Sequence, residues 1–276
     1  MGRRGSDEGD RDRASDRAAD RASASRTGQA VAAWRAALVR PSTPDGDPDA
    51  QARLSEGMRP VRDPVMRAHI EARTRFFDAQ VQEAVRQGVD QVVVLGAGYD
   101  DRALRFRSVG VHFFELDHPS TQSDKRRRLE QMGADVGGLT LVPVDFRHGD
   151  TYAVLEGYGH RPERPTLFLC EGLLVYLDED AIVGLLTVLR TRATGGSVLA
   201  ASLAVHAEGV GSERAVDQAN AGRPRATSEP WRTILPPSAH LALVTRSGWR
   251  VSDSLDDASF GTGAVSGRSL LVVARP

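Results

Sequence analysis

The chain has 276 residues, of which 40% are hydrophobic, so it is long enough to bury a sizeable core. Its 36 basic and 37 acidic side chains leave a formal net charge of −1, which disfavours nucleic acid or an anionic membrane as a partner. Cys170 is the only cysteine of the sequence, which excludes an internal disulfide framework and a cysteine-based metal cluster within one chain.

The sequence contains no apolar run near the roughly 18 residues that are needed to span a bilayer. Its first thirty residues also lack the apolar segment of a signal peptide. We therefore expect a cytoplasmic protein. No group of His and Asp at ligand spacing indicates a metal site.

Residues 1–26 alternate Arg with Asp and Ser and offer almost nothing to bury, which predicts a disordered tail. The composition changes at Thr27, and we expect residues 27–276 to form a single domain. Its first part, residues 27–90, is predicted to be a helical cap.

Two helices are predicted within this cap. Apolar residues recur at helical spacing from Thr27 until Pro41 ends the pattern. These apolar positions are Val31, Trp34, Leu38 and Val39. Asp63 followed by Pro64 is a typical helix start, and a 3.6-residue apolar repeat from there predicts a second helix that ends at Gly88.

Five short apolar runs then alternate with segments of helical pattern. The predicted strands cover residues 91–95, 111–114, 140–144, 166–170 and 197–203. The runs are continuously apolar, which is typical of a parallel sheet that helices cover on both faces. The sequence therefore predicts an α/β fold with a doubly wound sheet.

Residues 206–237 break this alternation. They are polar, contain Gly and Pro, and include Trp231, so we predict an insertion over one end of the sheet, on the substrate side. A helix over 238–247 and strands at 250–255 and 269–275 complete the domain. No helix is predicted between these last strands, so they are expected to form an antiparallel pair at the sheet edge.

Small or acidic residues follow the strands where they end. In chain order they are Gly96, Ala97 and Gly98, then Glu115 and Asp117, then Asp145, then Glu171. Ligands of doubly wound sheets bind outside the carboxyl ends of the strands. A glycine turn followed about twenty residues later by an acid fits a nucleoside whose ribose hydroxyls are held by a carboxylate.

The residues of the glycine turn distinguish between two kinds of nucleoside cofactor. A dinucleotide fingerprint has a third glycine where this chain has Asp101, and Asp100 and Asp101 would repel a pyrophosphate. S-adenosylmethionine carries a sulfonium and no phosphate, so we favour it over NAD. An NAD-linked oxidoreductase is the lower-ranked alternative.

Several motifs resemble the leucine carboxyl methyltransferase family, in its bacterial branch of S-adenosylmethionine-dependent O-methyltransferases. They are EARTRFFD (71–78), VVVLGAGYDDRALRF (92–106), FFELDHPSTQSDKRRRL (113–129), VPVDFRH (142–148) and CEGLLVYL (170–177). The resemblance covers residues 27–276. It implies a class I methyltransferase fold, with seven strands and an antiparallel hairpin at the edge.

The resemblance also implies roles for single residues in holding the cofactor. Arg73 matches the arginine that pairs with the methionine carboxylate, and the turn from Gly96 to Gly98 lies under the cofactor. Asp117 matches the acid at the ribose, with Glu115 as a local competitor. The pair that reads adenine is matched by Asp145 and Phe146.

On the acceptor side, Glu171 matches an acid near the amino acid moiety and the methyl-transfer region, and Tyr176 is expected to line the acceptor pocket. We therefore expect an O-methyltransferase acting on a carboxylate or hydroxyl of a small molecule or peptide, a role compatible with natural-product tailoring. A non-catalytic S-adenosylmethionine-binding protein is the alternative. The N-terminal segment and residues 206–237 depart from the eukaryotic members, which argues against a phosphatase C-terminus as the substrate.

A carboxylate acceptor is ionised at neutral pH and requires no general base, whereas a hydroxyl acceptor is helped by one. Histidine is the usual base near neutral pH. His118, His148 and His206 lie nearest the predicted strand ends and are the candidates.

Overall fold

The computed structural model describes residues 24–60, 64–147, 149–207, 209, 211–221, 229–256 and 269–276. These residues contain a seven-stranded sheet in the order β3-β2-β1-β4-β5-β7-β6. The strands are β1 (Gln91–Leu95), β2 (His112–Asp117), β3 (Leu139–Pro143), β4 (Thr166–Cys170), β5 (Val198–Ala204), β6 (Arg250–Asp256) and β7 (Ser269–Arg275).

The first five strands run parallel, and β7 pairs antiparallel with both β5 and β6. β1 and β4 are buried along their whole length, as continuous apolar runs at the centre of a covered sheet should be. The strand order reverses between β1 and β4: β2 and β3 lie on one side of β1, and β4 and β5 lie on the other. The predicted doubly wound sheet with an antiparallel edge pair is confirmed.

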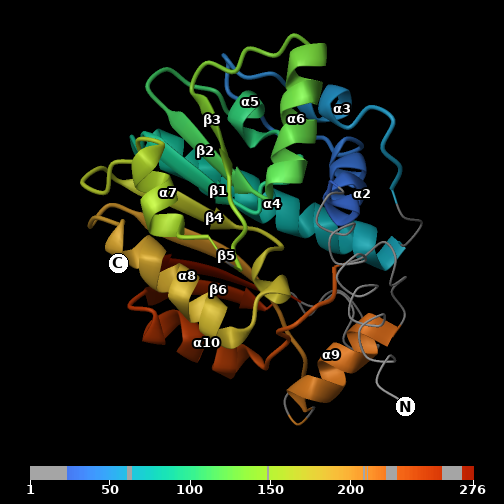
Figure 1. Cartoon of the computed structure of the whole chain (residues 1–276), viewed down its shortest axis with the longest axis vertical. Helices are drawn as coiled ribbons and strands as arrows, with labels where there is room; N and C mark the ends of the chain where they lie inside the picture. The colour runs from blue at the N-terminus through green and yellow to red at the C-terminus, as the bar shows by residue number, and fades with distance from the viewer. Residues whose placement is uncertain are drawn as a thin grey trace, which may run out of the picture.

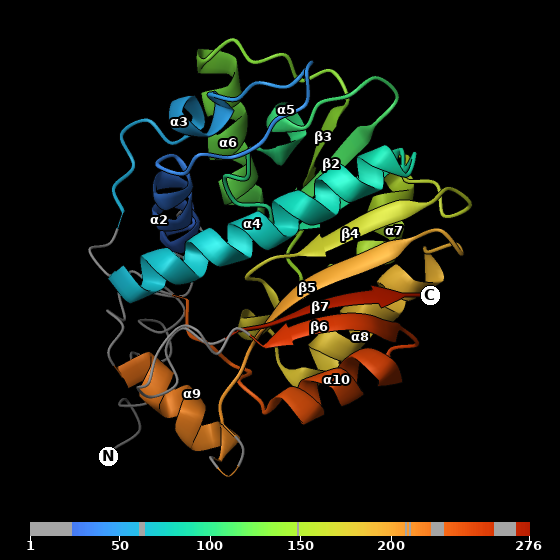
Figure 2. The same ribbon diagram turned by 180° about the vertical axis from the view of Figure 1, so that it is seen from behind.

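Helices cover both faces of this sheet (Figures 1 and 2). Their bounds are α2 (Arg26–Arg35), α3 (Ala50–Leu54), α4 (Pro64–Arg86), α5 (Arg102–Arg105), α6 (Pro119–Gln131), α7 (Thr151–Gly157), α8 (Glu179–Thr191), α9 (Ser212–Ala221) and α10 (Pro237–Arg246). α7, α8 and α10 lie on one face, and α4 crosses the other. α5 and α6 lie near β3, α3 lies beside α6, and α2 packs against α3 and α4.

The position of α4 matters most for the candidate site. Its buried residues Ile70, Phe77 and Val81 recur at helical spacing, and the last two pack on Val92 and Val94 of β1. At about 1.5 Å per residue its 23 residues span about 35 Å, so the helix reaches past the sheet. Its first three turns therefore lie over the carboxyl ends of the central strands.

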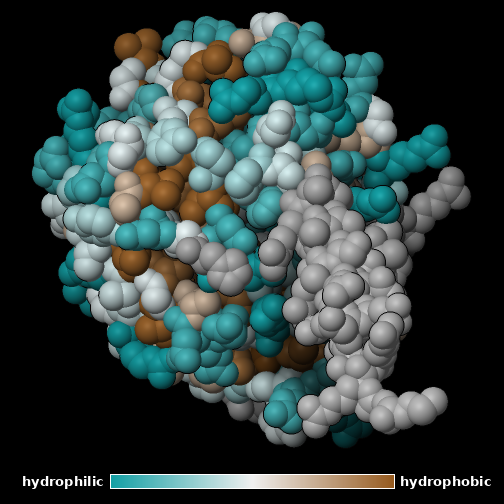
Figure 3. Space-filling view, in the orientation of Figure 1, coloured by the Kyte–Doolittle hydropathy of each residue, from teal (hydrophilic) through white to brown (hydrophobic). Residues whose placement is uncertain are grey.

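On the face that Figure 3 shows, hydrophobic residues form small patches that hydrophilic side chains separate. Among the helices of the described residues, none is long and apolar enough to cross a membrane.

The N-terminal helix differs from its prediction at both ends. α2 begins at Arg26, where the Ser25 hydroxyl accepts a hydrogen bond from the Gly28 N–H, while residues 1–23 of the predicted tail lie outside the described residues. The helix ends at Arg35 instead of continuing to Pro41. Val39, predicted as a core position, is 90% exposed, and Arg40 is buried in its place. Arg40 is buried because it pairs with buried acids, which are described below.

Two α-helices of the described residues were not predicted. α3 follows the loop that precedes Ala50, and α9 lies inside the 206–237 segment. Asp63, the predicted cap of α4, and residues 257–268, between the last two strands, lie outside the described residues.

Candidate functional site

The turn after β1 has the backbone geometry that its glycines predict. Gly96 and Gly98 have φ angles of +67° and +51°, in the left-handed region that favours glycine. A Cβ at Gly96 would lie 3.1 Å from the side chain of Leu173, so glycine also permits close packing there. The Gly98 N–H donates a hydrogen bond to Asp117 Oδ2 at 2.6 Å.

The two acids of β2 occupy different environments. Asp117 is partly exposed, and its carboxylate accepts from the N–H groups of Gly98 and His118, each at 2.6 Å. Glu115 is fully buried and forms an ion pair with Lys125, whose ammonium also donates to the Asp100 carbonyl at 2.6 Å. Burial raises the pKa of Glu115 to about 7. Of these two candidates, only Asp117 lies at the glycine turn.

Glu171, at the end of β4, is held by three arginines. Arg35 lies at 2.5 Å, Arg102 at 2.7 Å and Arg73, through its Nε, at 3.0 Å. The carboxylate is buried, and burial alone would raise its pKa. The three guanidinium groups outweigh burial and hold the pKa well below its usual range.

Glu171 belongs to a larger cluster, here called the arginine network. Its members are Arg35, Arg40, Arg73, Arg102 and Arg105 with Asp78, Asp100, Asp101 and Glu171. Arg40 pairs with Asp78 at 2.8 Å and with Asp101 at 2.6 Å. Arg102 pairs with Asp78 at 2.8 Å and with Asp100 at 2.5 Å. The network ties α2, α4, α5 and the end of β4 together.

The arginine network contradicts the expectation that Asp100 and Asp101 present their charges to a ligand. Asp100 and Asp101 were expected to repel a pyrophosphate, yet they are 3% and 0% exposed and each is paired with two arginines. Their charges are compensated inside the protein and do not face a ligand. The preference for S-adenosylmethionine over NAD therefore has to rest on other observations.

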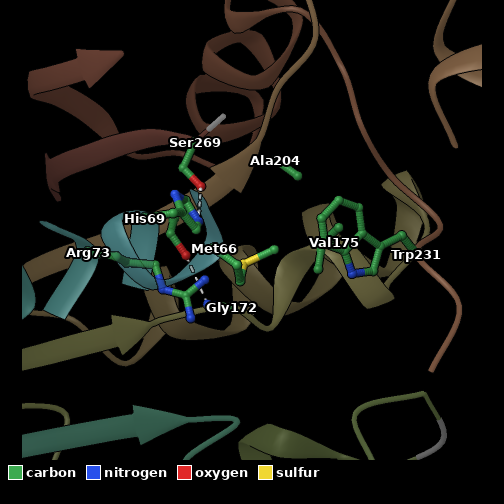
Figure 4. A pocket seen from close by; sticks show the side chains of 9 residues that line it. Met66, His69, Arg73, Gly172, Val175, Ala204, Trp231 and Ser269 are labelled. Carbon is green, nitrogen blue, oxygen red and sulfur yellow. Dashed lines mark hydrogen bonds between the residues drawn. The ribbon is translucent and has the colours of Figure 1, made fainter. Parts of the chain in front are cut away.

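Arg73 extends from the network into a cavity. Its Nε contacts Glu171, whereas its terminal nitrogens pack on Gly172, where a Cβ would lie 3.3 Å from the nearer one. The cavity is about 50 Å³ in volume (Figure 4). It is lined by Met66, His69, Arg73, Gly172, Val175, Ser202, Ala204, Trp231 and Ser269.

The remaining predicted cofactor and acceptor residues lie around this centre. Asp145, at the end of β3, accepts from the Arg147 N–H at 3.0 Å, and Phe146 packs partly against the core. Tyr176 packs against the cluster of Val175 and Ile234, beneath α9. Val175, one residue earlier, lines the cavity.

The three candidate histidines make local contacts or are not described. His118 caps α6, with Nδ1 2.8 Å from the Ser120 hydroxyl. His206 contacts the Ala207 carbonyl at 2.8 Å and the Ser212 hydroxyl at 3.2 Å. His148 lies outside the described residues. The histidine that lines the cavity is His69, which sequence reasoning did not single out.

Sequence reasoning also missed Arg35 and Arg102. For Arg35 the available signal was an arginine inside an otherwise apolar segment, AAWRAAL, whereas Arg102 lies in the charged segment DDRALRF and carries no such signal. Such an arginine is buried only when acids from elsewhere in the chain meet it. Here Glu171 lies 69 residues from Arg102.

Comparison with solved structures defines the fold class. A methyltransferase candidate from Thermobifida fusca superposes with a TM-score of 0.59 at 13% identity, covering 87% of this chain and 97% of that one. The magnesium protoporphyrin IX methyltransferase of Synechocystis, solved with bound S-adenosylhomocysteine, gives 0.53 at 13% identity, with coverage of 82% and 93%. The fold is that of class I methyltransferases.

Residues 12–190 match the family model of leucine carboxyl methyltransferase. The chain belongs to this family. Its predicted resemblance is confirmed.

The curated relatives are bacterial proteins named as candidate S-adenosyl-L-methionine-dependent methyltransferases. One from Streptomyces avermitilis is 34% identical over 180 residues, which is 64% of this chain and 60% of the relative. One from Mycobacteroides abscessus is 42% identical over 112 residues, covering 40% and 37%. The chain thus aligns with about 60% or less of the length of these relatives.

Proposed function

We propose that this protein is an S-adenosylmethionine-dependent O-methyltransferase that acts on a carboxylate or hydroxyl of a small molecule or peptide. The observation that carries the proposal is the position of Arg73. The arginine network holds five arginines against four carboxylates, and Arg73 is its most exposed arginine. Among the described residues, its terminal nitrogens take part in no hydrogen bond or ion pair.

A guanidinium whose two terminal nitrogens pack on Gly172, just after β4, suits the carboxylate of an amino acid cofactor. We assign this carboxylate to Arg73 and the ribose hydroxyls to Asp117. Two backbone N–H groups occupy only part of the acceptor capacity of Asp117, so oxygen lone pairs remain for the ribose. The residues present therefore fit the cofactor.

The other assignments follow the strand ends. The backbone from Gly96 through Ala97 to Gly98 lies under the cofactor, and Asp145 and Phe146 contact the adenine. Family membership and the names of the relatives support these assignments.

S-adenosylmethionine would supply the methyl group on a sulfonium, which is already activated because its sulfur leaves as a neutral thioether. The protein then mainly aligns the reactants. Glu171, expected at the methyl-transfer region, keeps its charge at neutral pH because its pKa is strongly lowered. We therefore assign it the role of fixing Arg35, Arg73 and Arg102, not that of a proton acceptor.

Two segments are proposed to enclose the site within a single domain. Residues 27–90 form the cap, since Gly28 Cα lies 3.7 Å from the position that a Cβ on Gly98 would take. Residues 206–237 form the substrate side, because Trp231 lines the cavity and Tyr176 packs beneath α9. Tyr176 then lies at the outer part of the acceptor pocket.

The cofactor assignment is tested by Arg73→Ala, with Arg75→Ala as a matched control. Arg75 lies on the same helix, is exposed and pairs with Glu71 at 2.8 Å. Removing a charge-assisted, two-donor contact should weaken S-adenosylhomocysteine binding about tenfold to a hundredfold. Isothermal titration calorimetry measures the dissociation constants.

Arg75→Ala should bind like the unchanged protein. Asp117→Ala should also weaken binding. Unchanged affinity in both Arg73→Ala and Asp117→Ala would contradict the site assignment. Stabilisation against heat by NADH but not by S-adenosylhomocysteine would favour the oxidoreductase alternative.

Catalysis is tested by incubating the protein with methyl-labelled cofactor and a cell extract of small molecules and peptides. Mass spectrometry should detect a labelled methyl ester or ether. Cofactor binding without any labelled product would favour the non-catalytic alternative.

A further inference from the structure

The helix that follows the glycine turn is enclosed by the protein. Residues 97–106 are all buried, and Asp101 and Arg102, where α5 begins, are 0% exposed. α5 has only four residues, and α2 packs on the turn before it, with Gly28 Cα 3.7 Å from the position of a Cβ on Gly98. In dinucleotide sites the pyrophosphate binds at the N-terminus of this helix. Here a ligand at the turn cannot reach that N-terminus.

The backbone donors of the turn are also used within the protein. The Ala97 N–H donates to the Leu116 carbonyl at 3.0 Å. The Gly98 N–H donates to Asp117 Oδ2 at 2.6 Å, and the Asp100 N–H donates to a carbonyl of the turn at 2.8 Å. Successive backbone N–H groups at such turns commonly hold a phosphate. In this protein these three donors already have partners, and one of the partners is a carboxylate.

Leu173 lies against the exposed part of the turn. A Cβ on Gly96 would lie 3.1 Å from the Cβ and 3.2 Å from the Cδ1 of Leu173, so the leucine side chain rests on the glycine backbone. Leu173 follows Gly172, on which the terminal nitrogens of Arg73 pack. Gly96 and Leu173 are both partly exposed. The surface between the end of β4 and the glycine turn is therefore apolar.

The two proposed contacts of the cofactor lie on either side of Leu173. Asp117, assigned to the ribose hydroxyls, is bonded to the glycine turn, and Arg73, assigned to the carboxylate, packs on Gly172. The group on the 5′ carbon of the ribose leads from the first contact toward the second, so it meets Leu173 and Gly96. In S-adenosylmethionine this group begins with sulfur, which needs no hydrogen-bond donor.

A 5′-phosphate at the same position would lack favourable contacts. Leu173 offers no donor, and burying a charged group against an apolar side chain without hydrogen bonds is costly. Asp117 would repel the phosphate as a like charge in a partly buried site. The charge of Arg73 is offset by Glu171 at 3.0 Å. A single phosphate on the 5′ carbon also stops short of Arg73, which is assigned to a group several bonds further along the cofactor.

We propose that Leu173 and the enclosed N-terminus of α5 determine the class of ligand, so that the site accepts nucleosides with a thioether or sulfonium on the 5′ carbon and excludes those with a 5′-phosphate. The inference rests on the proposed function, from which it takes the positions of the ribose and the carboxylate. It replaces the selectivity that was expected of Asp100 and Asp101, whose charges are compensated within the arginine network. Leu173 is a specificity-determining residue and takes no part in bond making.

The test compares two adenosine derivatives that differ only in the group on the 5′ carbon, methylthioadenosine and AMP. Each competes with S-adenosylhomocysteine for the full chain, and isothermal titration calorimetry gives the dissociation constants. Methylthioadenosine should displace S-adenosylhomocysteine. AMP should bind at least about tenfold more weakly than methylthioadenosine, as the missing donors and the like charge of Asp117 require.

The variant Leu173→Ser tests the leucine itself. The serine hydroxyl can donate a hydrogen bond and leaves room for water, so the ratio of the two dissociation constants should fall at least about threefold. Leu241→Ser is the matched control, because Leu241 is also a partly buried leucine packed on the same core cluster but lies on α10. It should leave the ratio unchanged. A ratio measured within one variant does not depend on the fraction of protein that is folded, so it separates specificity from stability.

Equal affinity for AMP and methylthioadenosine would overturn the proposal, as would failure of methylthioadenosine to displace S-adenosylhomocysteine. An unchanged ratio in Leu173→Ser would overturn the role of Leu173. Each of these outcomes is obtained with a protein that binds S-adenosylhomocysteine. Failure of the proposed function is different, because the unchanged protein would then not bind S-adenosylhomocysteine.

Discussion

At the scale of single residues, each carboxylate of the arginine network is held by at least two guanidinium groups. Asp78 contacts Arg40 and Arg102, and Asp101 contacts Arg40 and Arg105. Buried ion pairs of this kind are strongly destabilising to break, because the remaining charge stays buried without compensation. The network therefore fixes the direction of Arg73 more than it adds net stability.

A buried histidine outside the candidate site, His160, is expected to make the stability of the fold depend on pH. His160 accepts a hydrogen bond at Nδ1 from Arg192 Nε at 3.1 Å, and its Nε2 lies 3.0 Å from the Thr166 hydroxyl. Burial, and then Arg192, lower its pKa from 6.5 to about 4. A proton on Nδ1 would face the guanidinium, so the folded protein resists protonation.

Between these two pKa values the unfolded chain binds a proton that the folded chain does not. The free energy of unfolding therefore falls as pH drops from about 6.5 to about 4, by up to about 1.4 kcal/mol per pH unit from this residue. His160→Gln removes the titration, so urea midpoints at about pH 7 and about pH 5 should lie closer together. The same spread in both proteins would contradict this origin.

The sequence offers candidate site residues at the strand ends because acids and glycines there can be recognised locally. Gly98 and Asp117 meet in the structure as this reasoning requires. The arginines that hold Glu171 could not be found in this way, because their partners are distant in sequence: Arg73 and Glu171 are 98 residues apart. Only the folded chain shows which acids face a ligand and which face an arginine.

At the scale of elements, α2 is attached to the sheet by Arg35. This side chain reaches Glu171 at 2.5 Å and Asp100 at 3.4 Å. Arg35→Leu removes both contacts, while Arg102 still compensates both acids. We expect the free energy of unfolding to fall by about 1–3 kcal/mol, and hydrogen exchange over 26–35 to accelerate.

Arg53→Ala is the matched control, since Arg53 forms an exposed ion pair with Asp47. Its effect should stay within about 1 kcal/mol. Exchange over 26–35 that is equally slow in Arg35→Leu and the unchanged protein would show that α2 is held by its apolar contacts instead.

Elements with a strong apolar pattern were predicted closely, and those without one were missed. β4 and β7 match their predicted bounds because each is a continuous apolar run. α9 was not predicted because its packed residues, Ala215 and Val216 among them, are few and small within a polar segment. Such a helix depends on the surface that it covers more than on its own sequence.

At the scale of the whole molecule, large apolar clusters on both faces share the strands of one sheet. One cluster joins α8 and α10 to the sheet, and the other joins α4 to it. Loss of either cluster exposes strands that the other requires. We therefore predict one cooperative unfolding transition, with equal calorimetric and van't Hoff enthalpies. A separate early transition in the calorimetric scan would contradict this prediction.

The place of β7 in the sheet has a consequence for synthesis of the chain. β7 is made after β6, yet it lies between β5 and β6 and pairs with both. Until residues 269–275 leave the ribosome, the apolar strand β5 has an unpaired edge, and such edges favour aggregation. Nascent chains stalled before residue 269 should therefore bind chaperones that recognise exposed apolar strands.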